Sequence, residues 1–276
     1  MITAFRKLLE LSEGVITLPC APSQINLQLQ DARNIVNDIS KYLAVGSHAE
    51  YFNVSKERYA HYIAAAKWKL QDSARILDIG NAPGHVAACL ETLGHKVIGL
   101  NLNSAWKNTY PDPSLYERFQ VVEHDIEKET LPFQAGEFDA IIFTEVLEHV
   151  AIKNPSTLLL DFARVLKKNG VVIFSTPNVC NISNIYSLVM GKNIFWEPSS
   201  FYGSFDRHNR EFTPAEVSDL FRDGGWEQLA FWGMSDHSNW RSGGGNQFAY
   251  DFIAEVGEDS PLLRNTILGV FGSPNR

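Results

Sequence analysis

The stretch of sequence that decides the fold is Arg75-Ile76-Leu77-Asp78-Ile79-Gly80-Asn81-Ala82-Pro83-Gly84-His85. Its first half is a nearly continuous apolar run, which is typical of a β-strand covered on both faces. Two glycines interrupt the run, and residues 86–93 then combine good helix formers with apolar positions at helical spacing. The stretch therefore predicts a strand, a tight turn that a ligand can approach closely, and a helix.

The overall composition fits one α/β domain with appendages. The chain has 276 residues, of which 45% are hydrophobic, and ordinary domains hold roughly 100–200 residues. Acidic residues outnumber basic ones by 32 to 24, which gives a net charge of −8. No run of Lys or Arg stands out, so the chain is a poor candidate for gripping a nucleic acid through its phosphates.

The cysteines and the N-terminus bear on the compartment. Three cysteines are widely separated and have neither metal nor disulfide spacing, which suits a reducing cytoplasm. Charged residues interrupt the apolar positions near the N-terminus, so we expect neither a signal peptide nor a membrane span. The sequence therefore predicts a cytoplasmic protein, and nothing in it indicates an oligomeric state.

Strand and helix patterns alternate along the chain and favour a parallel sheet. After a helix at 51–70 and the first strand, further strands are expected at 96–100, 120–123, 140–144 and 171–175. A helix at 155–168 is expected to end at Asn169-Gly170. A final pair of strands is expected at 226–234 and 247–256, with a helix before it that begins at Thr213.

Three regions are expected on either side of this core or inserted in it. Residues 1–50 carry two amphipathic patterns, which indicate helices that either pack on the edge of the domain or form a lid over the substrate. Residues 51–257 form the ligand-binding domain. Within it, residues 179–212 form a long aromatic insertion that we expect to be the wall of the acceptor site. Residues 258–276 are expected to be a C-terminal tail.

The spacing Asp-x-Gly-x-Ala-x-Gly from Asp78 to Gly84 resembles the first motif of class I S-adenosylmethionine-dependent methyltransferases. A glycine-rich turn alone would also fit a dinucleotide-binding fold, but the acidic residue before the glycines favours the methyltransferases. The resemblance covers residues 51–256, and the chain departs from it at Ala82, where a glycine is usual. It implies a Rossmann-like fold with a mostly parallel seven-stranded sheet and an antiparallel C-terminal strand, and S-adenosylmethionine as the methyl donor.

Donor-binding residues are expected at the ends of the first four strands. The carboxylate of Asp78 can receive an ammonium group, and Asn101 stands where an acidic residue about 20 positions past the glycine turn normally bonds the ribose. A neutral amide can still accept one hydroxyl hydrogen bond and donate another, although Asn101 could instead only cap its strand. By resemblance, Asp125 meets the adenine amino group. The full expected set is Asp78, Gly80, Asn81, Ala82, Gly84, Asn101, Leu102, Asp125, Ile126 and Thr144.

A second constellation, Glu145-Val146-Leu147-Glu148-His149, follows the fourth strand. If it begins a helix, both carboxylates and the imidazole project from one face. With His208 they could hold a divalent cation such as Mg²⁺. The pattern resembles ubiquinone-pathway O-methyltransferases and small-RNA 3′-terminal 2′-O-methyltransferases. That resemblance implies a metal site of Glu145, Glu148, His149 and His208.

Alternatives to a metal remain open at this constellation. Glu145 could contact the donor turn, Glu148 could pair with Arg207 or Arg210, and His149 could be a satisfied, partly buried histidine. In a metal-free enzyme His149 could serve as the general base. In either kind of enzyme the expected catalytic residues are His149, Glu148 and His208.

The expected function is an O-methyltransferase that acts on a small hydroxylated acceptor, such as a sugar or a glycosylated metabolite. The run 207–213 also resembles bacterial methyltransferases of polysaccharide and glycan pathways. Methylation of nitrogen or carbon stays open, and the net charge disfavours RNA as the acceptor. From another class, Ala82 and Asn101 would also suit a non-catalytic module that binds an adenosyl group or a partner.

Overall fold

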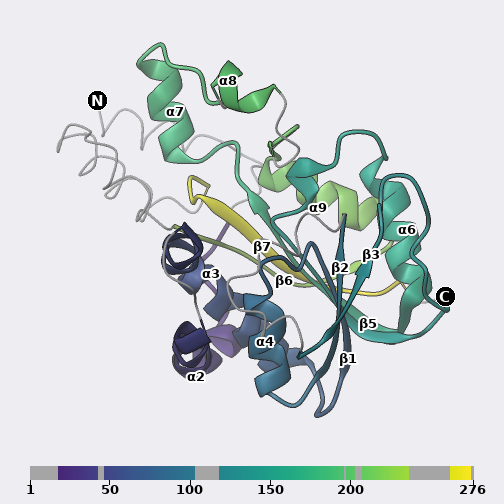
Figure 1. Cartoon of the computed structure of the whole chain (residues 1–276). Helices are drawn as coiled ribbons and strands as arrows, with labels where there is room; N and C mark the ends of the chain where they lie inside the picture. Colours follow the sequence, from purple (N-terminus) through teal and green to yellow (C-terminus); the bar gives the residue numbers. More distant parts are fainter. Residues whose placement is uncertain are drawn as a thin grey trace.

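A computed structural model of the chain describes residues 18–42, 47–102, 118–195, 197–202, 207–235 and 262–274. These residues form a seven-stranded sheet with the strand order β3-β2-β1-β4-β5-β7-β6 (Figure 1). The first five strands in this order pair in parallel, and β7 is antiparallel to both of its neighbours. The predicted fold class is thereby confirmed.

The strands follow the apolar runs of the sequence. Their bounds are β1 Arg75–Ile79, β2 Lys96–Asn101, β3 Gln120–Glu123, β4 Phe138–Thr144, β5 Leu166–Pro177, β6 Glu227–Met234 and β7 Thr266–Gly272. The central strands β1 and β4 are almost wholly buried because helices cover both faces of the sheet.

The last strand corrects the expected end of the domain. β7 is buried along its whole length between β5 and β6, although residues 258–276 read as a tail in the sequence. The strand expected at 247–256 lies outside the described residues. The sheet therefore extends past residue 257, and the prediction of a tail there is wrong.

Helices cover the sheet in two layers. Their bounds are α2 Ser23–Ile39, η1 Ser40–Tyr42, α3 Ser47–Lys69, α4 His85–Thr92, η3 Leu147–His149, α6 Pro155–Val165, α7 Ile182–Val189, α8 Pro198–Phe201 and α9 Pro214–Asp223. The helices α2, α3 and α4 pack with one face of the sheet, and α6 and α9 with the other (Figure 1). Of the described helices, none is both long and apolar enough to cross a membrane.

Helix α6 ends three residues earlier than the sequence indicates. Leu166 already pairs with Phe138 in the sheet, and a bulge follows before the regular pairing of β4 with β5 resumes at Val171. Asn169 lies in the bulge with a φ of 65°, a left-handed conformation that ordinary helix residues do not adopt. Tertiary pairing therefore overrides the helix-favouring lysines at 167 and 168.

The two accessory regions have different surroundings. Helix α2 buries one apolar face against α3 and α4 and belongs to the core on that side of the sheet. The first amphipathic pattern, at residues 5–11, lies outside the described residues. In the insertion, α7 and α8 stand away from both helical layers (Figure 1). Leu188 and Val189 at the end of α7 are exposed, as is Tyr202 just after α8.

Candidate functional site

A cavity of about 920 Å³ lies at the carboxyl ends of the parallel strands, where open α/β sheets bind ligands. Helix α3 contributes to one wall, and residues 207–209 contribute to another. The cavity brings together Asp78, Gly80, Asn81, Ala82, Asn101, Leu102, Asp125, Ile126, Thr144, Glu145, Glu148, His149 and His208. Of the residues expected at the site, Gly84 is not in its lining; it is the N-cap of α4.

The glycine turn after β1 explains which of its positions require glycine. Gly80 has a φ of 73° and a Cβ added there would come within 2.5 Å of Cγ2 of Val146; Gly84 has a φ of 88°. Both positions therefore need glycine. Ala82 has no positive φ, so alanine meets no left-handed strain there. The departure from the usual glycine is thus compatible with the turn.

Asp78 lies near the end of β1 and is the most isolated acid of the cavity. Its side chain is 3% exposed, and its Oδ2 atom has no hydrogen-bond partner among the described residues. Burial raises the pKa of this carboxyl to about 8. A buried acceptor of this kind suits a cationic ligand group, because an ammonium would both donate a hydrogen bond and favour the ionised form.

Asn101 faces the glycine turn. Its Nδ2 donates to Oδ1 of Asn81 at 2.6 Å, and its Oδ1 accepts from the backbone N of Ala82 at 3.2 Å. Both polar ends of the carboxamide therefore bind the turn. The expected contact with the ribose stays a prediction.

Asp125 lies in the loop after β3. Its carboxylate accepts from the backbone N of Glu127 at 3.0 Å and from Nζ of Lys128 at 2.9 Å. Burial tends to raise the pKa of Asp125, but these two donors outweigh it and the net shift is downward. Asp125 is therefore an anionic acceptor at the edge of the cavity, and its expected contact with adenine stays a prediction.

Glu145 does not begin a helix, which corrects the expected geometry of the second constellation. It has a φ of 54°, and only the single turn η3 follows, so Glu145, Glu148 and His149 do not form a helical face. The Glu145 carboxylate pairs instead with Arg58 of α3 and accepts from Oγ of Ser175 at 2.7 Å. Glu145 thus lies outside the group that Glu148 and His149 form with His208.

Sequence reasoning missed Arg58 and two tyrosines of α3, Tyr59 and Tyr62, which line the same cavity. Tyr62 is linked to Glu145 through Ser175, whose Oγ lies 2.7 Å from the tyrosine hydroxyl. Burial lowers the pKa of Arg58, but the charge of Glu145 raises it and prevails. The local signal in the sequence was an arginine that stands beside Tyr59 and one helical turn from Tyr62.

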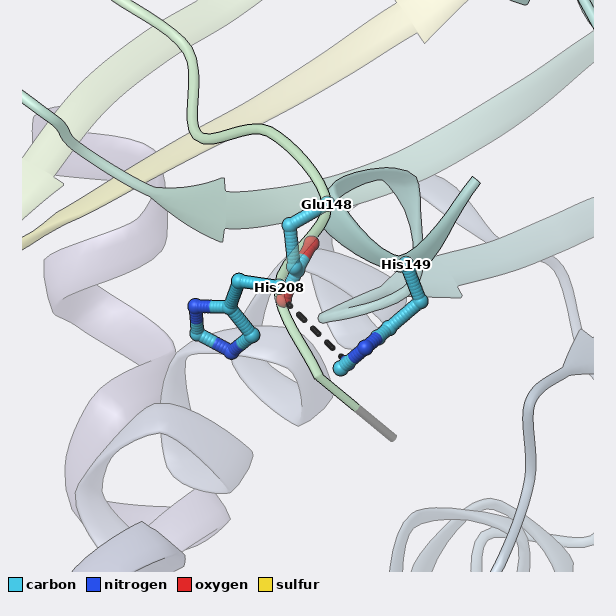
Figure 2. Close-up of side chains that lie close together, drawn as sticks. All are labelled: Glu148, His149 and His208. Atoms are coloured by element: carbon cyan, nitrogen blue, oxygen red, sulfur yellow. Dashed lines mark ion pairs between the residues drawn. The ribbon is translucent and has the colours of Figure 1, made fainter. Parts of the chain in front are cut away.

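Glu148, His149 and His208 come together in the cavity (Figure 2). One ligand atom from each lies within 4.8 Å of the others. The Glu148 side chain is 1% exposed; its Oε2 accepts from Oγ1 of Thr176 at 2.9 Å, and its Oε1 is 3.9 Å from Nε2 of His149. The centroids of the two imidazole rings are 5.1 Å apart, and the rings are arranged edge to face. The resemblance noted in the sequence predicted that His208 lies close to Glu148 and His149.

Hydrogen bonds orient both imidazoles. Nδ1 of His149 donates to the backbone carbonyl of Arg207 at 3.0 Å, and Nδ1 of His208 donates to Oε1 of Glu211 at 2.8 Å. Nδ1 of each ring is therefore engaged by an acceptor outside the group of Glu148, His149 and His208. Metal-binding histidines in proteins are usually oriented in this way, by a carbonyl or a carboxylate on the other nitrogen.

The segment after the insertion is fixed to this turn. The backbone N of Asn209 donates to the carbonyl of Glu148 at 2.7 Å, and its Nδ2 donates to the carbonyl of His149 at the same distance. Arg210 pairs with Glu216, so the alternative ion pair between Glu148 and Arg210 is not formed. His208 is thus held beside Glu148 by the backbone and side-chain hydrogen bonds of its neighbour Asn209.

The electrostatics of the group favour shared protons or a cation. Burial, and then the charge of Glu145, raise the pKa of Glu148 to about 8. Burial lowers the pKa of His208, but the bond to Glu211 and the charge of Glu148 raise it and prevail. A carboxylate oxygen and two imidazole nitrogens fit a divalent transition-metal ion or Zn²⁺ better than Mg²⁺, which prefers oxygen ligands.

One protein-family model matches about two thirds of the chain. The model of a family described as a methyltransferase domain matches residues 49–230. The chain is 30% identical over 171 residues to a ubiquinone biosynthesis O-methyltransferase of Maricaulis maris, covering 59% of this chain and 63% of that protein. A protein of the same name from Nitrosococcus oceani is 32% identical over 154 residues, covering 55% and 63%. The match thus spans less than two thirds of either relative.

Solved structures show the same fold. A chain from the complex between the Haloferax volcanii Trm112 methyltransferase activator and the putative methyltransferase superposes with a TM-score of 0.58 and 16% identity, covering 92% of this chain and 99% of that chain. A putative sarcosine dimethylglycine methyltransferase of Galdieria sulphuraria gives a TM-score of 0.53 and 14% identity, covering 88% and 98%. At these identities the likeness concerns the fold alone.

Proposed function

Because this chain belongs to the class I S-adenosylmethionine-dependent methyltransferases, we propose that it transfers the donor's methyl group to a hydroxyl oxygen of a small acceptor. The observation that carries the proposal is the single cavity that joins the donor turn to Glu148, His149 and His208. A methyl donor and a deprotonating group within one cavity are what methyl transfer to oxygen requires.

In this proposal the donor lies along the ends of the first four strands. Asp78 receives its ammonium group, and the backbone of the glycine turn follows its amino-acid part. Asp125 and Ile126 hold the adenine end, with Leu102 and Thr144 completing the walls. The unpartnered Oδ2 of Asp78 supports the first of these contacts.

The acceptor hydroxyl lies beside Glu148, His149 and His208. Its oxygen attacks the sulfonium methyl in line, so a carbon–oxygen bond forms while the carbon–sulfur bond breaks and its electron pair returns to sulfur. His149 takes the hydroxyl proton at Nε2, with Glu148 beside it to stabilise the imidazolium that forms. The products are a methyl ether and the neutral thioether S-adenosylhomocysteine.

A divalent cation fits the same three residues. Glu148, His149 and His208 would hold it, while Glu145 stays paired with Arg58. A bound cation would lower the pKa of an acceptor hydroxyl by several units. In that case the two Nδ1 hydrogen bonds keep both imidazoles oriented, and the acceptor proton passes to another base or to water.

The acceptor is proposed to be a sugar or a glycosylated metabolite with adjacent hydroxyls. Arg207 from the insertion lines the cavity together with the catalytic group, and its guanidinium lies 5.0 Å from the ring of Phe201, which is not itself a lining residue. Oxygen is favoured over nitrogen or carbon because the two similar relatives are O-methyltransferases by name.

The test is transfer of a labelled methyl group from S-adenosylmethionine to a panel of hydroxylated acceptors. Glu148→Gln should lower transfer by about 100-fold or more, while the Kd for S-adenosylhomocysteine stays within about twofold. Glu216→Gln is the matched control, because Glu216 caps α9 away from the cavity. Normal transfer by Glu148→Gln would refute the proposed site.

Chelation tests the cation separately. If the three residues hold a metal, exhaustive chelation should abolish transfer, and readdition of Mn²⁺, Zn²⁺ or Mg²⁺ should restore it. Full activity after chelation, with metal absent by elemental analysis, would leave His149 as the general base and remove the cation from the proposal.

A further inference from the structure

The end of β2 and the glycine turn contact each other at three successive residues. The backbone N of Gly80 donates to the carbonyl of Leu100 at 2.7 Å. One residue later, the side chain of Asn101 bonds both Asn81 and Ala82. The turn that approaches the donor is therefore docked on β2 as well as being connected to β1.

Because Gly99 of β2 has no side chain, the side chain of Asn81 can pack against its backbone. A Cβ added at Gly99 would come within 2.3 Å of Nδ2 and 2.5 Å of Cγ of Asn81, so the Asn81 side chain lies directly against the Gly99 backbone. Gly99 has no positive φ and does not line the cavity. Glycine is required at this position by the asparagine that covers it, not by its own backbone conformation.

The hydrogen bonds of the pair use both polar ends of a carboxamide at position 101. The Nδ2 group of Asn101 is the donor to Asn81 and its Oδ1 is the acceptor from Ala82. A carboxylate only accepts hydrogen bonds, so the acidic residue usual in this fold could not make the first contact with Asn81 in the same orientation. Both side chains are buried, where an unmade hydrogen bond is costly.

We propose that Asn101 is a positioning residue, which holds the donor turn through Asn81, and that it is not the ligand of the donor's ribose. We name Asn81 and Asn101 the asparagine clasp. The affinity for the donor should then depend on the clasp. No part of that affinity should come from a hydrogen bond between Asn101 and a ribose hydroxyl. This inference rests on donor binding alone, so it stands or falls independently of the acceptor proposed above.

The test measures coupling between residue 101 and a ribose hydroxyl. The Kd values of S-adenosylhomocysteine and of its 2′-deoxy and 3′-deoxy analogues are measured by calorimetry with the wild-type chain and with Asn101→Ala. We expect Asn101→Ala to weaken all three ligands by the same factor, about tenfold, so their affinity ratios stay within about twofold of the wild-type ratios. A wild-type preference for either hydroxyl of about tenfold or more that disappears in Asn101→Ala would overturn the proposal.

Variants of the partner residue test the clasp itself. Asn81→Ala should weaken the same ligands as much as Asn101→Ala, and the double variant should lose little more than either single variant, because one interaction is removed. Additive losses in the double variant would overturn the clasp.

Gly99→Ala tests the clasp at a residue that does not line the cavity. Its new Cβ should displace Asn81 and weaken all three ligands equally, with thermal denaturation showing that the variant is folded. Unchanged affinity in a folded Gly99→Ala would also overturn the proposal. If the alanine variants at 81 and 101 do not fold, Gly99→Ala still decides it.

Discussion

At the scale of single residues, the burial of Asp78 makes the stability of the protein depend on pH. Its pKa is raised from 3.8 to about 8 by burial, so the folded protein keeps a proton that the unfolded chain has already released. The stability contributed by this carboxyl is fully present below the unfolded pKa and is lost as the pH rises through about 8.

We therefore expect the ligand-free wild type to lose stability relative to Asp78→Asn between pH 4 and pH 8. Urea denaturation at intervals across this range measures the difference. Asp139→Asn is the matched control, for which we expect the opposite pH dependence. The pKa of Asp139 is shifted downward, because Lys167 and the backbone N of Arg75 outweigh its burial. The stability that Asp139 contributes is therefore lost as the pH falls. A constant difference between wild type and Asp78→Asn would contradict a protonated Asp78.

At the scale of elements, two loops at the cavity are joined by one carboxylate. Oε1 of Glu127 accepts from the backbone N atoms of Ala151, Ile152 and Lys153, and Nζ of Lys153 donates back to the carbonyl of Glu129 at 2.8 Å. Both loops line the cavity. The carboxylate therefore links the loop after β3 to the segment that follows η3.

Replacing Glu127 by Ala should separate these loops. Up to three backbone donors lose their acceptor, but they are near the surface and water can replace it, so we expect only about 1–2 kcal/mol of lost stability. Donor affinity should fall, measured as the Kd of S-adenosylhomocysteine. Glu129→Ala is the control, since Glu129 accepts from Lys153 through its backbone carbonyl, which the substitution keeps. Unchanged affinity in Glu127→Ala would show that the loops hold their positions without it.

The strand β7 is the second element with a measurable role. Phe271 of β7 stacks on Phe221 of α9 with ring centroids 3.6 Å apart, and both side chains are fully buried. We expect Phe271→Ala to lower the unfolding free energy by about 3–5 kcal/mol, measured by chemical denaturation. Phe195→Ala, at an exposed position, should change it by less than about 0.5 kcal/mol. Equal effects of the two variants would contradict a core position for β7.

At the scale of the whole molecule, α2 belongs to the core of the catalytic domain. Its apolar face is buried with α3 and α4, and Lys67 and Arg33 add ion pairs between α2 and α3. A lid would exchange between open and closed positions with little loss of stability. A helix with this buried face would not.

We expect Val36→Asp, on the buried face of α2, to lower the unfolding free energy by more than about 3 kcal/mol, because it buries a carboxyl without a partner. Leu27→Asp is the control, since Leu27 is 80% exposed on the same helix. Denaturation of both variants, alongside donor binding, separates the two roles. Normal stability with altered donor kinetics in Val36→Asp would indicate a lid.

The sequence by itself determined the strand, turn and helix around Asp78 and the positions of the five parallel strands along the chain. With the resemblance, it also gave a set of site residues of which all but Gly84 line the cavity. These features follow from local patterns: apolar runs, glycines where φ is positive, and side chains that end strands at one edge of a sheet. The pairing of Glu148-His149 with His208 was also predicted, because the resemblance supplied a contact between segments far apart in the chain.

Only the tertiary structure decided the partners of the buried polar groups. Glu145 is held by Arg58, 87 positions away, and its left-handed backbone removes it from the group of Glu148. Asn101 is occupied by the turn, and the sheet is completed by β7 from beyond the expected end of the domain. A local pattern states which side chains need partners or burial, but which distant group satisfies them depends on the packing of the whole chain.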